Sequence, residues 1–193
     1  MLLTKKAWDE KYMSPSIPWE ANIPEPYLVS IIDSGITIMP KTALDIGCGM
    51  GTNSIFLAER GFEVTAVDLS KVAIDAARVR ARNAGQKVSF RNKNFLEFEK
   101  DAKFGFILDR RVFHFFDPEE RPIYVDKVFQ LLEDKGKFLL IVSSNFEFGD
   151  NRYHFTKEQL EEIFRKFKFF SVELIELKDH LERPKSWAVI MKK

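Results

Sequence analysis

The sequence predicts an α/β fold: a Rossmann-like, doubly wound, seven-stranded and mostly parallel sheet with one antiparallel strand and helices on both faces. Short runs rich in β-branched residues alternate with segments of helical periodicity, which is typical of a parallel sheet covered by helices. A turn with three glycines, Gly47 to Gly51, joins the first strand to a helix. Two apolar runs close the chain, as expected for an antiparallel hairpin.

Strands and helices follow one another in a regular order. The first helix runs from Thr52 to Gly61, and the second follows the N-cap residue Ser70 and stops at Gly85. The strands are expected at residues 42–47, 63–69, 87–92, 104–110, 137–144, 171–177 and 186–192.

Two more helices are marked by capping patterns. One begins at Asp117, with Pro122 moving its regular part later in the chain. The other opens with the capping-box pair Thr156 and Gln159. No repeat or linker divides the chain, so one domain is expected. It would comprise an N-terminal aromatic and helical cap (1–34), a cofactor-binding core (42–150) and a C-terminal helix and hairpin (151–193).

The composition limits the classes of binding partner that we expect. The 30 basic and 29 acidic residues give a net charge of +1, which provides no general attraction for nucleic acid or an anionic membrane. The single cysteine, Cys48, excludes an internal disulfide and fits a reducing compartment. No apolar run is long enough to span a bilayer. We therefore expect a cytoplasmic monomer or homodimer with a small-molecule partner.

The glycines alternate at positions 47, 49 and 51, whereas the dinucleotide fingerprint requires G-x-G-x-x-G and position 52 here is Thr52. This spacing disfavours a pyrophosphate and fits a nucleoside without phosphate that lies close to the main chain. Asp68 ends the next strand at the same edge of the sheet. Its carboxylate can accept two hydrogen bonds from the cis hydroxyls of a ribose. The alternative role for Asp68 is capping of the following helix.

At these residues the sequence resembles the class I S-adenosylmethionine-dependent methyltransferases. "LDIGCGMG" matches their first motif, D-x-G-x-G-x-G, and Asp68 matches the acidic residue of the second. The resemblance covers roughly residues 8 to 150 and is closest to the small-molecule branch of thiopurine and tellurite methyltransferases. It implies S-adenosylmethionine as cofactor, the strand order 3-2-1-4-5-7-6, and a thiol, selenium or tellurium acceptor.

The resemblance also implies roles for individual residues. Asp45 would brace the loop or reach the α-amino group of the cofactor through water, and Asn94 would accept from the adenine amino group. Phe95 would stack on adenine or, alternatively, belong to the core. The full cofactor set expected is Trp8, Trp19, Asp45, Gly47, Cys48, Gly49, Gly51, Asn53, Asp68, Leu69, Asn94, Phe95 and Asp109.

The methyl acceptor would lie beyond the fourth strand. Asp109 is expected between cofactor and acceptor, with a structural salt bridge as the alternative. His114 is a candidate general base or a polar wall group, and a thiol or selenol acceptor would need no base. The residues expected to contact the acceptor are Arg110, Phe113, His114 and Arg152.

An aromatic arm precedes the first strand. Trp8, Tyr12 and Trp19 would close over the cofactor, as the resemblance implies, or simply pack a helix on the domain. The three histidines are scattered, so no metal site is predicted. Two other functions stay open: a noncatalytic cofactor-binding module and a nicotinamide-dependent oxidoreductase.

Overall fold

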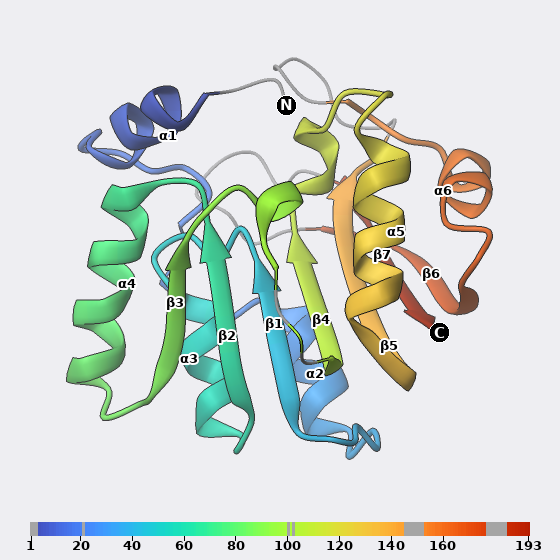
Figure 1. Ribbon diagram of the computed structural model, residues 1–193, viewed down its shortest axis with the longest axis horizontal. Coiled ribbons are helices and arrows are strands. Elements are labelled where there is room, and N and C mark those ends of the chain that lie inside the picture. Colours follow the sequence, from blue (N-terminus) through green and yellow to red (C-terminus); the bar gives the residue numbers. More distant parts are fainter. Residues whose placement is uncertain (1–3, 21, 100, 102, 145–152, 177–184) are drawn as a thin grey trace.

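The computed structural model describes residues 4–20, 22–99, 101, 103–144, 153–176 and 185–193. Its seven-stranded sheet has the order β3-β2-β1-β4-β5-β7-β6 (Figure 1). Strand β7 is antiparallel to both of its neighbours, and the other neighbouring pairs are parallel. The strands are β1 (Thr42–Ile46), β2 (Glu63–Asp68), β3 (Val88–Asn92), β4 (Phe104–Arg110), β5 (Leu132–Ser143), β6 (Lys168–Glu176) and β7 (Lys185–Lys192). The predicted fold class is confirmed.

Helices cover both faces of the sheet. Three of them, α2 (Pro26–Asp33), α3 (Thr52–Glu59) and α4 (Lys71–Asn83), pack on one face, and α5 (Arg121–Leu131) and α6 (Lys157–Ile163) pack on the other. The short helix α1 (Lys5–Tyr12) lies instead across the edge where the parallel strands end (Figure 1). That edge also receives the 3-10 turns η1 (Phe95–Glu97) and η2 (Phe113–Phe115).

The capping residues act as their sequence patterns predict. The Ser70 hydroxyl accepts from the Ala73 amide at the start of α4, and Thr156 and Gln159 form a complete capping box on α6. Helix α5 begins later than its first signal, at Arg121. Pro122 lacks an amide hydrogen and is therefore tolerated only in the first turn, where it lies.

The fifth strand differs from its prediction. It begins at Leu132, five residues earlier than residue 137, and its pairing with β4 shifts register between Phe104 and Phe106. Lys135 has a φ of 67°, so the early part of the strand is irregular. Only the regular stretch shows the continuous apolar pattern of a central strand, which explains the later predicted start.

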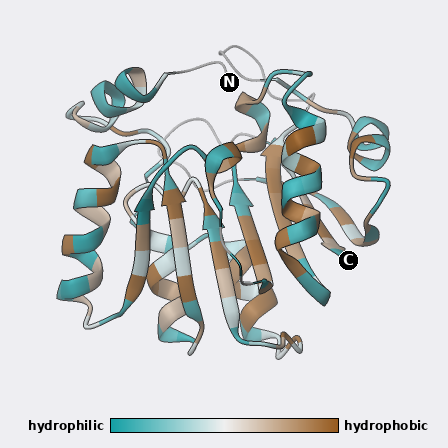
Figure 2. Cartoon of the chain, viewed as in Figure 1, coloured by the Kyte–Doolittle hydropathy of each residue, from teal (hydrophilic) through white to brown (hydrophobic). Residues whose placement is uncertain are grey.

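Hydrophobic residues concentrate on the sheet and on the faces of the helices that pack against it (Figure 2). Phenylalanines supply much of this core, and the largest fully buried side chains include Phe104, Phe106, Phe113, Phe116, Phe138 and Phe164. Among the described residues, no helix combines the length and apolar character needed to cross a membrane.

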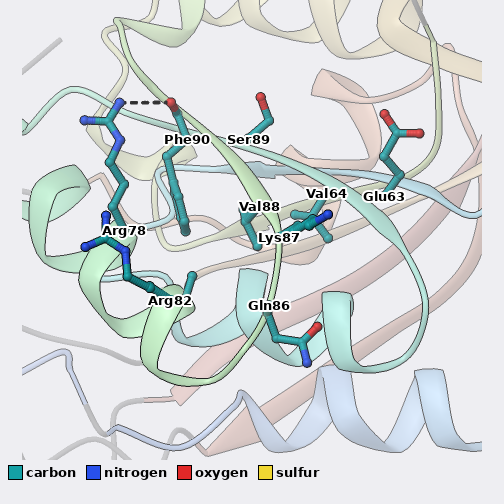
Figure 3. Close-up of a pocket in the computed structure, with 10 residues that line it drawn as sticks. Glu63, Val64, Arg78, Arg82, Gln86, Lys87, Val88, Ser89 and Phe90 are labelled. Atoms are coloured by element: carbon teal, nitrogen blue, oxygen red, sulfur yellow. Dashed lines mark hydrogen bonds between the residues drawn. The ribbon is translucent and has the colours of Figure 1, made fainter.

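The exposed edge of the sheet, strand β3, carries a groove of about 570 Å³ between this strand and α4 (Figure 3). Arg78 reaches across it and donates to the carbonyl of Phe90 at 3.2 Å, which covers part of the open edge. Glu63 and Lys87 line the groove near the amino ends of β2 and β3. The groove therefore opens mainly toward the amino ends of these strands, away from the edge where the parallel strands end.

Candidate active site at the carboxyl edge of the sheet

The glycine turn leaves β1 and is tied to β2 by backbone hydrogen bonds. The amides of Gly47 and Cys48 both donate to the carbonyl of Val67, at 2.7 and 3.1 Å. Gly47, Gly49 and Gly51 have φ values of 63°, 55° and 83°. Each lies in the left-handed region that favours glycine, so the backbone path alone accounts for all three.

The surroundings of the three glycines differ. A Cβ at Gly47 would lie 2.2 Å from the Val112 side chain, and one at Gly51 would lie 3.0 Å from Ala77. Both glycines thus face the protein interior. A Cβ at Gly49 would meet the Tyr12 hydroxyl at 2.9 Å. We predicted that all three glycines let a ligand approach the main chain. The structure favours Gly49 for this role, because the position of its missing side chain faces the arm and not the protein interior.

Asp68 ends β2 directly beside this glycine. Its Oδ2 accepts from the Gly49 amide at 2.9 Å, and its Oδ1 accepts from the Ser70 amide at 2.8 Å. Burial raises the pKa of Asp68 to about 6. The backbone hydrogen bonds lower the pKa, but their effect is smaller than that of burial. Ser70, and not Asp68, is the side-chain cap of α4. Each carboxylate oxygen keeps a lone pair for a further donor.

The aromatic arm lies over the glycine turn. The rings of Trp8 and Trp19 lie 5.8 Å apart, and those of Tyr12 and Trp19 lie 5.7 Å apart. The Tyr12 hydroxyl accepts from Trp19 Nε1 at 3.3 Å while it contacts Gly49. Trp8 also packs edge-on against Phe115 of η2, with centroids 5.0 Å apart. The arm therefore connects the glycine turn to the end of β4.

Two acidic residues of the arm hold it to the helices that begin at this edge. Asp9 Oδ1 accepts from the Ser70 hydroxyl at 2.6 Å and from the Val72 amide at 3.2 Å, at the start of α4. The Ser70 hydrogen bond lowers the pKa of Asp9. Glu20 accepts from Thr52 Oγ1 at 2.7 Å, at the start of α3. Carboxylates are favourable at helix N-termini, where the backbone amides are unpaired.

Arg110 and Asn53, two residues predicted to bind a ligand, instead contact the N-terminal segment that carries the arm. Arg110 donates to Glu25 Oε2 at 2.9 Å and to the Trp19 carbonyl at 3.4 Å. Asn53 Oδ1 accepts from the Glu25 amide at 2.9 Å. The structure therefore places both side chains among protein partners, which supports a role in positioning the arm.

Asp45 and Asp109 lie inside the protein beneath the site. Asp45 accepts from the Ser54 hydroxyl at 2.5 Å, so it braces the first turn of α3, which follows the glycine turn. Asp109 accepts from the Tyr124 hydroxyl at 2.5 Å and from the Val112 amide at 2.8 Å. Burial raises the pKa of each carboxyl to about 7. Asp109 was expected to face the crevice, but its internal partners favour a structural role.

The aromatic candidates on this side belong mainly to the core. Phe95 packs on Tyr124 with ring centroids 5.1 Å apart, and Phe113 packs on the same tyrosine at 5.0 Å. Both are buried, which favours the core alternative for Phe95 and gives Phe113 the same role. Asn94 Oδ1 caps η1 by accepting from the Leu96 amide at 3.1 Å. This oxygen retains one lone pair.

The remaining candidates differ in exposure. Leu69 is half-buried beside Asp68, and Cys48 is buried within the glycine turn, where burial raises the pKa of its thiol well above the usual value. His114 is fully buried, and its Nδ1 lies 3.2 Å from the Ser143 amide. Arg152 falls outside the described residues. Within the described ranges, no cluster of acidic, histidine or cysteine side chains could hold a metal ion.

Sequence reasoning missed Asp9 and Glu20. In the sequence these acids resemble the ordinary surface charges around them, because their partners Ser70 and Thr52 are distant in the chain. Their one local signal is position: each follows a tryptophan of the arm, Trp8 or Trp19.

The residues fit a nucleoside that carries no phosphate. The two oxygens of Asp68 can each receive one hydroxyl beside the amide that they already bind. Gly49 offers a face without a side chain, and the Tyr12 hydroxyl lies against the position where a Cβ would be, as a ribose hydroxyl could. No described lysine or arginine donates to the glycine turn, as a pyrophosphate site would favour.

Comparisons with known proteins point to the same class of enzyme. Residues 43–136 match the family described as "Methyltransferase domain". A probable thiol methyltransferase 2 from Arabidopsis thaliana is 23% identical over 172 residues, which are 88% of this chain and 76% of the relative.

Two solved structures share the fold. One comes from work on the conversion of a disulfide bond into a thioacetal group during echinomycin biosynthesis. It has a TM-score of 0.85 and 18% identity, over 98% of this chain and 91% of the other. The other is the 1,6-didemethyltoxoflavin-N1-methyltransferase of Burkholderia thailandensis with bound S-adenosylhomocysteine. It has a TM-score of 0.71 and 22% identity, over 90% and 79% of the two chains. The family match over residues 43–136, the strand order and the pairing of the glycine turn with Asp68 together support a class I S-adenosylmethionine-dependent methyltransferase.

Proposed function

We propose that this methyltransferase acts on a small sulfur nucleophile, a thiol, with selenium and tellurium species as chemical relatives of that acceptor. The observation that carries the cofactor assignment is the position of Asp68, held by the amides of Gly49 and Ser70 at the end of β2. The observation that favours a thiol is that neither Asp109 nor His114 is placed to act as a general base.

Oxygen and nitrogen acceptors commonly need a general base, whereas a thiol is partly ionised without one. Among the described residues at this edge, Asp109 is occupied by Tyr124 and two amides, and burial keeps the pKa of His114 well below its usual value. Neither is placed to take a proton from an acceptor. The thiol methyltransferase among the relatives supports the same assignment.

In this proposal Asp68 binds the ribose, Gly49 admits the ligand to the main chain, and Leu69 and Asn94 lie toward the adenine. S-adenosylmethionine supplies a methyl group on a sulfonium sulfur when it is bound. Trp8, Tyr12 and Trp19 exclude water, and Asp9 and Glu20 hold them in place. Since methyl transfer is an in-line displacement, positioning and removal of water supply much of the rate. The lone thiol Cys48 fits a cytoplasmic, reducing location.

Binding and product analysis test the proposal separately. Calorimetry with S-adenosylhomocysteine and with NAD should give binding only for the former. Mass spectrometry of reactions with S-adenosylmethionine should show one added methyl on thiols and none on amines or phenols of similar size. Methylation confined to amines or phenols would refute the thiol assignment, and failure to bind S-adenosylhomocysteine would refute the cofactor site.

A further inference from the structure

A cluster of buried polar side chains lies where β4 and β5 end next to each other. Arg111 follows β4 directly, with a φ of 67°, and donates to the Ser186 hydroxyl at 2.8 Å. His114 of η2 lies beside Ser143, the last residue of β5, and both are fully buried. Buried polar groups cost stability unless they are hydrogen-bonded, so each member of such a cluster needs a partner.

The partners of His114 fix the position of its proton. The backbone amide of Ser143 points to Nδ1 at 3.2 Å, and a backbone amide can only donate. Nδ1 therefore carries the lone pair, and the Ser143 hydroxyl, at 2.9 Å, donates to the same atom. A neutral imidazole has one proton, which must then lie on Nε2.

The ring is held neutral by its surroundings. Burial lowers the pKa of His114 well below its usual value, and the charges of Arg111 and His154 lower it further. Nε2 is buried and finds no hydrogen-bond partner among the described residues. His114 thus presents an uncharged N–H donor whose acceptor is missing.

His114 lies close to both the glycine turn and the aromatic arm. Val112, two residues before His114, packs against Gly47 of the glycine turn. Phe115 contacts the His114 ring with centroids 4.6 Å apart and the ring of Trp8 at 5.0 Å. The histidine therefore lies one ring away from the arm, on the β4–β5 side of the glycine turn.

We infer that His114 positions the methyl acceptor by donating a hydrogen bond from Nε2–H to it, with the tautomer set by the Ser143 amide. This inference rests on the proposed function. In it, His114 acts as a hydrogen-bond donor in a fixed tautomer and not as a general base. The acceptor must offer a lone pair to Nε2–H, as a thiolate does, and must lose its proton before it binds. Phe115 would have to turn aside for an acceptor to reach the histidine.

The proton position can be measured without turnover. The chain has only three histidines, so protein labelled with ¹⁵N-histidine gives a simple long-range ¹H–¹⁵N spectrum, in which loss of one set of signals in His114→Gln assigns His114. We expect protonated Nε2, unprotonated Nδ1 and no titration between about pH 5.5 and 8. Ser143→Ala should keep this tautomer because the backbone amide remains. A protonated Nδ1 or a ring that titrates would overturn the inference.

Kinetics then distinguish positioning from packing. His114→Phe should lower kcat/KM for a thiol at least tenfold, leave the Kd of S-adenosylhomocysteine within about twofold, and be rescued in large part by His114→Gln, which retains an N–H donor. For thiols of graded acidity, the pH profile should follow the pKa of each thiol. Full activity of His114→Phe, or a single inflection common to all thiols, would overturn the role. If S-adenosylhomocysteine fails to bind the unmodified chain, the proposed function fails, whereas the tautomer is decided by the spectrum of the free protein.

Discussion

At the scale of single residues, three carboxylates at one edge of the sheet have different surroundings. Asp45 and Asp109 are surrounded by protein donors, a hydroxyl or a hydroxyl with amides. Asp68 accepts from the backbone amides of Gly49 and Ser70 and lies beside Gly49. Each residue lies at or next to the carboxyl end of its strand, so the identity of its neighbours separates Asp68, which we propose binds the ribose, from the two acids held by side-chain hydroxyls.

The affinity for S-adenosylhomocysteine should depend on the ionisation of Asp68. With a pKa of about 6, the carboxylate is ionised above this pH and can accept from two hydroxyls, whereas the protonated form has an O–H directed at an amide or the ligand. Binding should therefore weaken as the pH falls through about 6. Asp68→Asn should lose about 1–3 kcal/mol of binding free energy at pH 8 and show little pH dependence.

Calorimetry from about pH 5 to 8 measures both effects. Asp75→Asn is the matched control, because Asp75 lies on α4 and pairs with Lys71 and Arg78 at the exposed surface. This control should bind like the unmodified chain. A binding constant that is independent of pH in the unmodified chain would contradict the role of Asp68.

At the scale of secondary-structure elements, the arm and the helices α3 and α4 support one another. The arm supplies carboxylates to both helix N-termini through Asp9 and Glu20, and the helices in turn hold its aromatic residues over Gly49. Helix α1 has no buried residue of its own, so it has little core to fix it. Its position consequently depends on these polar contacts and on the packing of Trp8.

Removal of the Asp9 carboxylate should loosen the arm. In Asp9→Ala, α4 loses two hydrogen bonds at its start, which should cost about 0.5–2 kcal/mol of unfolding free energy. S-adenosylhomocysteine should dissociate several-fold faster, as measured by stopped-flow fluorescence of the arm tryptophans. The neighbouring Glu10→Ala is the control, since Glu10 makes an exposed ion pair with Lys6, at 3.9 Å. Equal dissociation rates in the two variants would exclude a closing role for Asp9.

At the scale of the whole molecule, the buried acids link stability to pH. Asp45, Asp68 and Asp109 have pKa values of about 7, 6 and 7 in the folded chain, above the ordinary value of 3.8. The folded chain therefore binds more protons at these groups than the unfolded chain between about pH 4 and 7. Their contribution to the unfolding free energy falls as the pH rises through this window and is level above it. Buried His114, whose pKa is lowered, acts in the opposite sense below its usual value of 6.5.

A difference measurement isolates one of these groups. Asp45→Asn removes a titrating carboxyl and keeps a side chain of the same shape beside Ser54. Urea denaturation at each pH gives the unfolding free energy of both chains. The value for the variant minus the value for the unmodified chain should rise steadily from about pH 4 to 7. A constant difference across this range would mean that Asp45 does not titrate in the folded chain as its burial requires.

The sequence by itself determined the strand and helix order, the positions of Ser70 and Thr156 as caps, and the pairing of the glycine turn with Asp68. These features depend on periodicity, capping and turn chemistry, all of which act over a few residues. Predicted roles for Asp109, Arg110 and Phe113 rested on the resemblance and on their position at or just after the end of the fourth strand, which does not specify what surrounds a side chain.

Only the tertiary structure decided those surroundings. It brought Tyr124 to Asp109, Glu25 to Arg110 and the arm to Gly49. It also set the proton of His114 through the amide of Ser143. Burial and hydrogen-bond partners at this edge come from residues far apart in the chain, and they, rather than residue type, determine whether an acid binds a ligand or a histidine carries a proton.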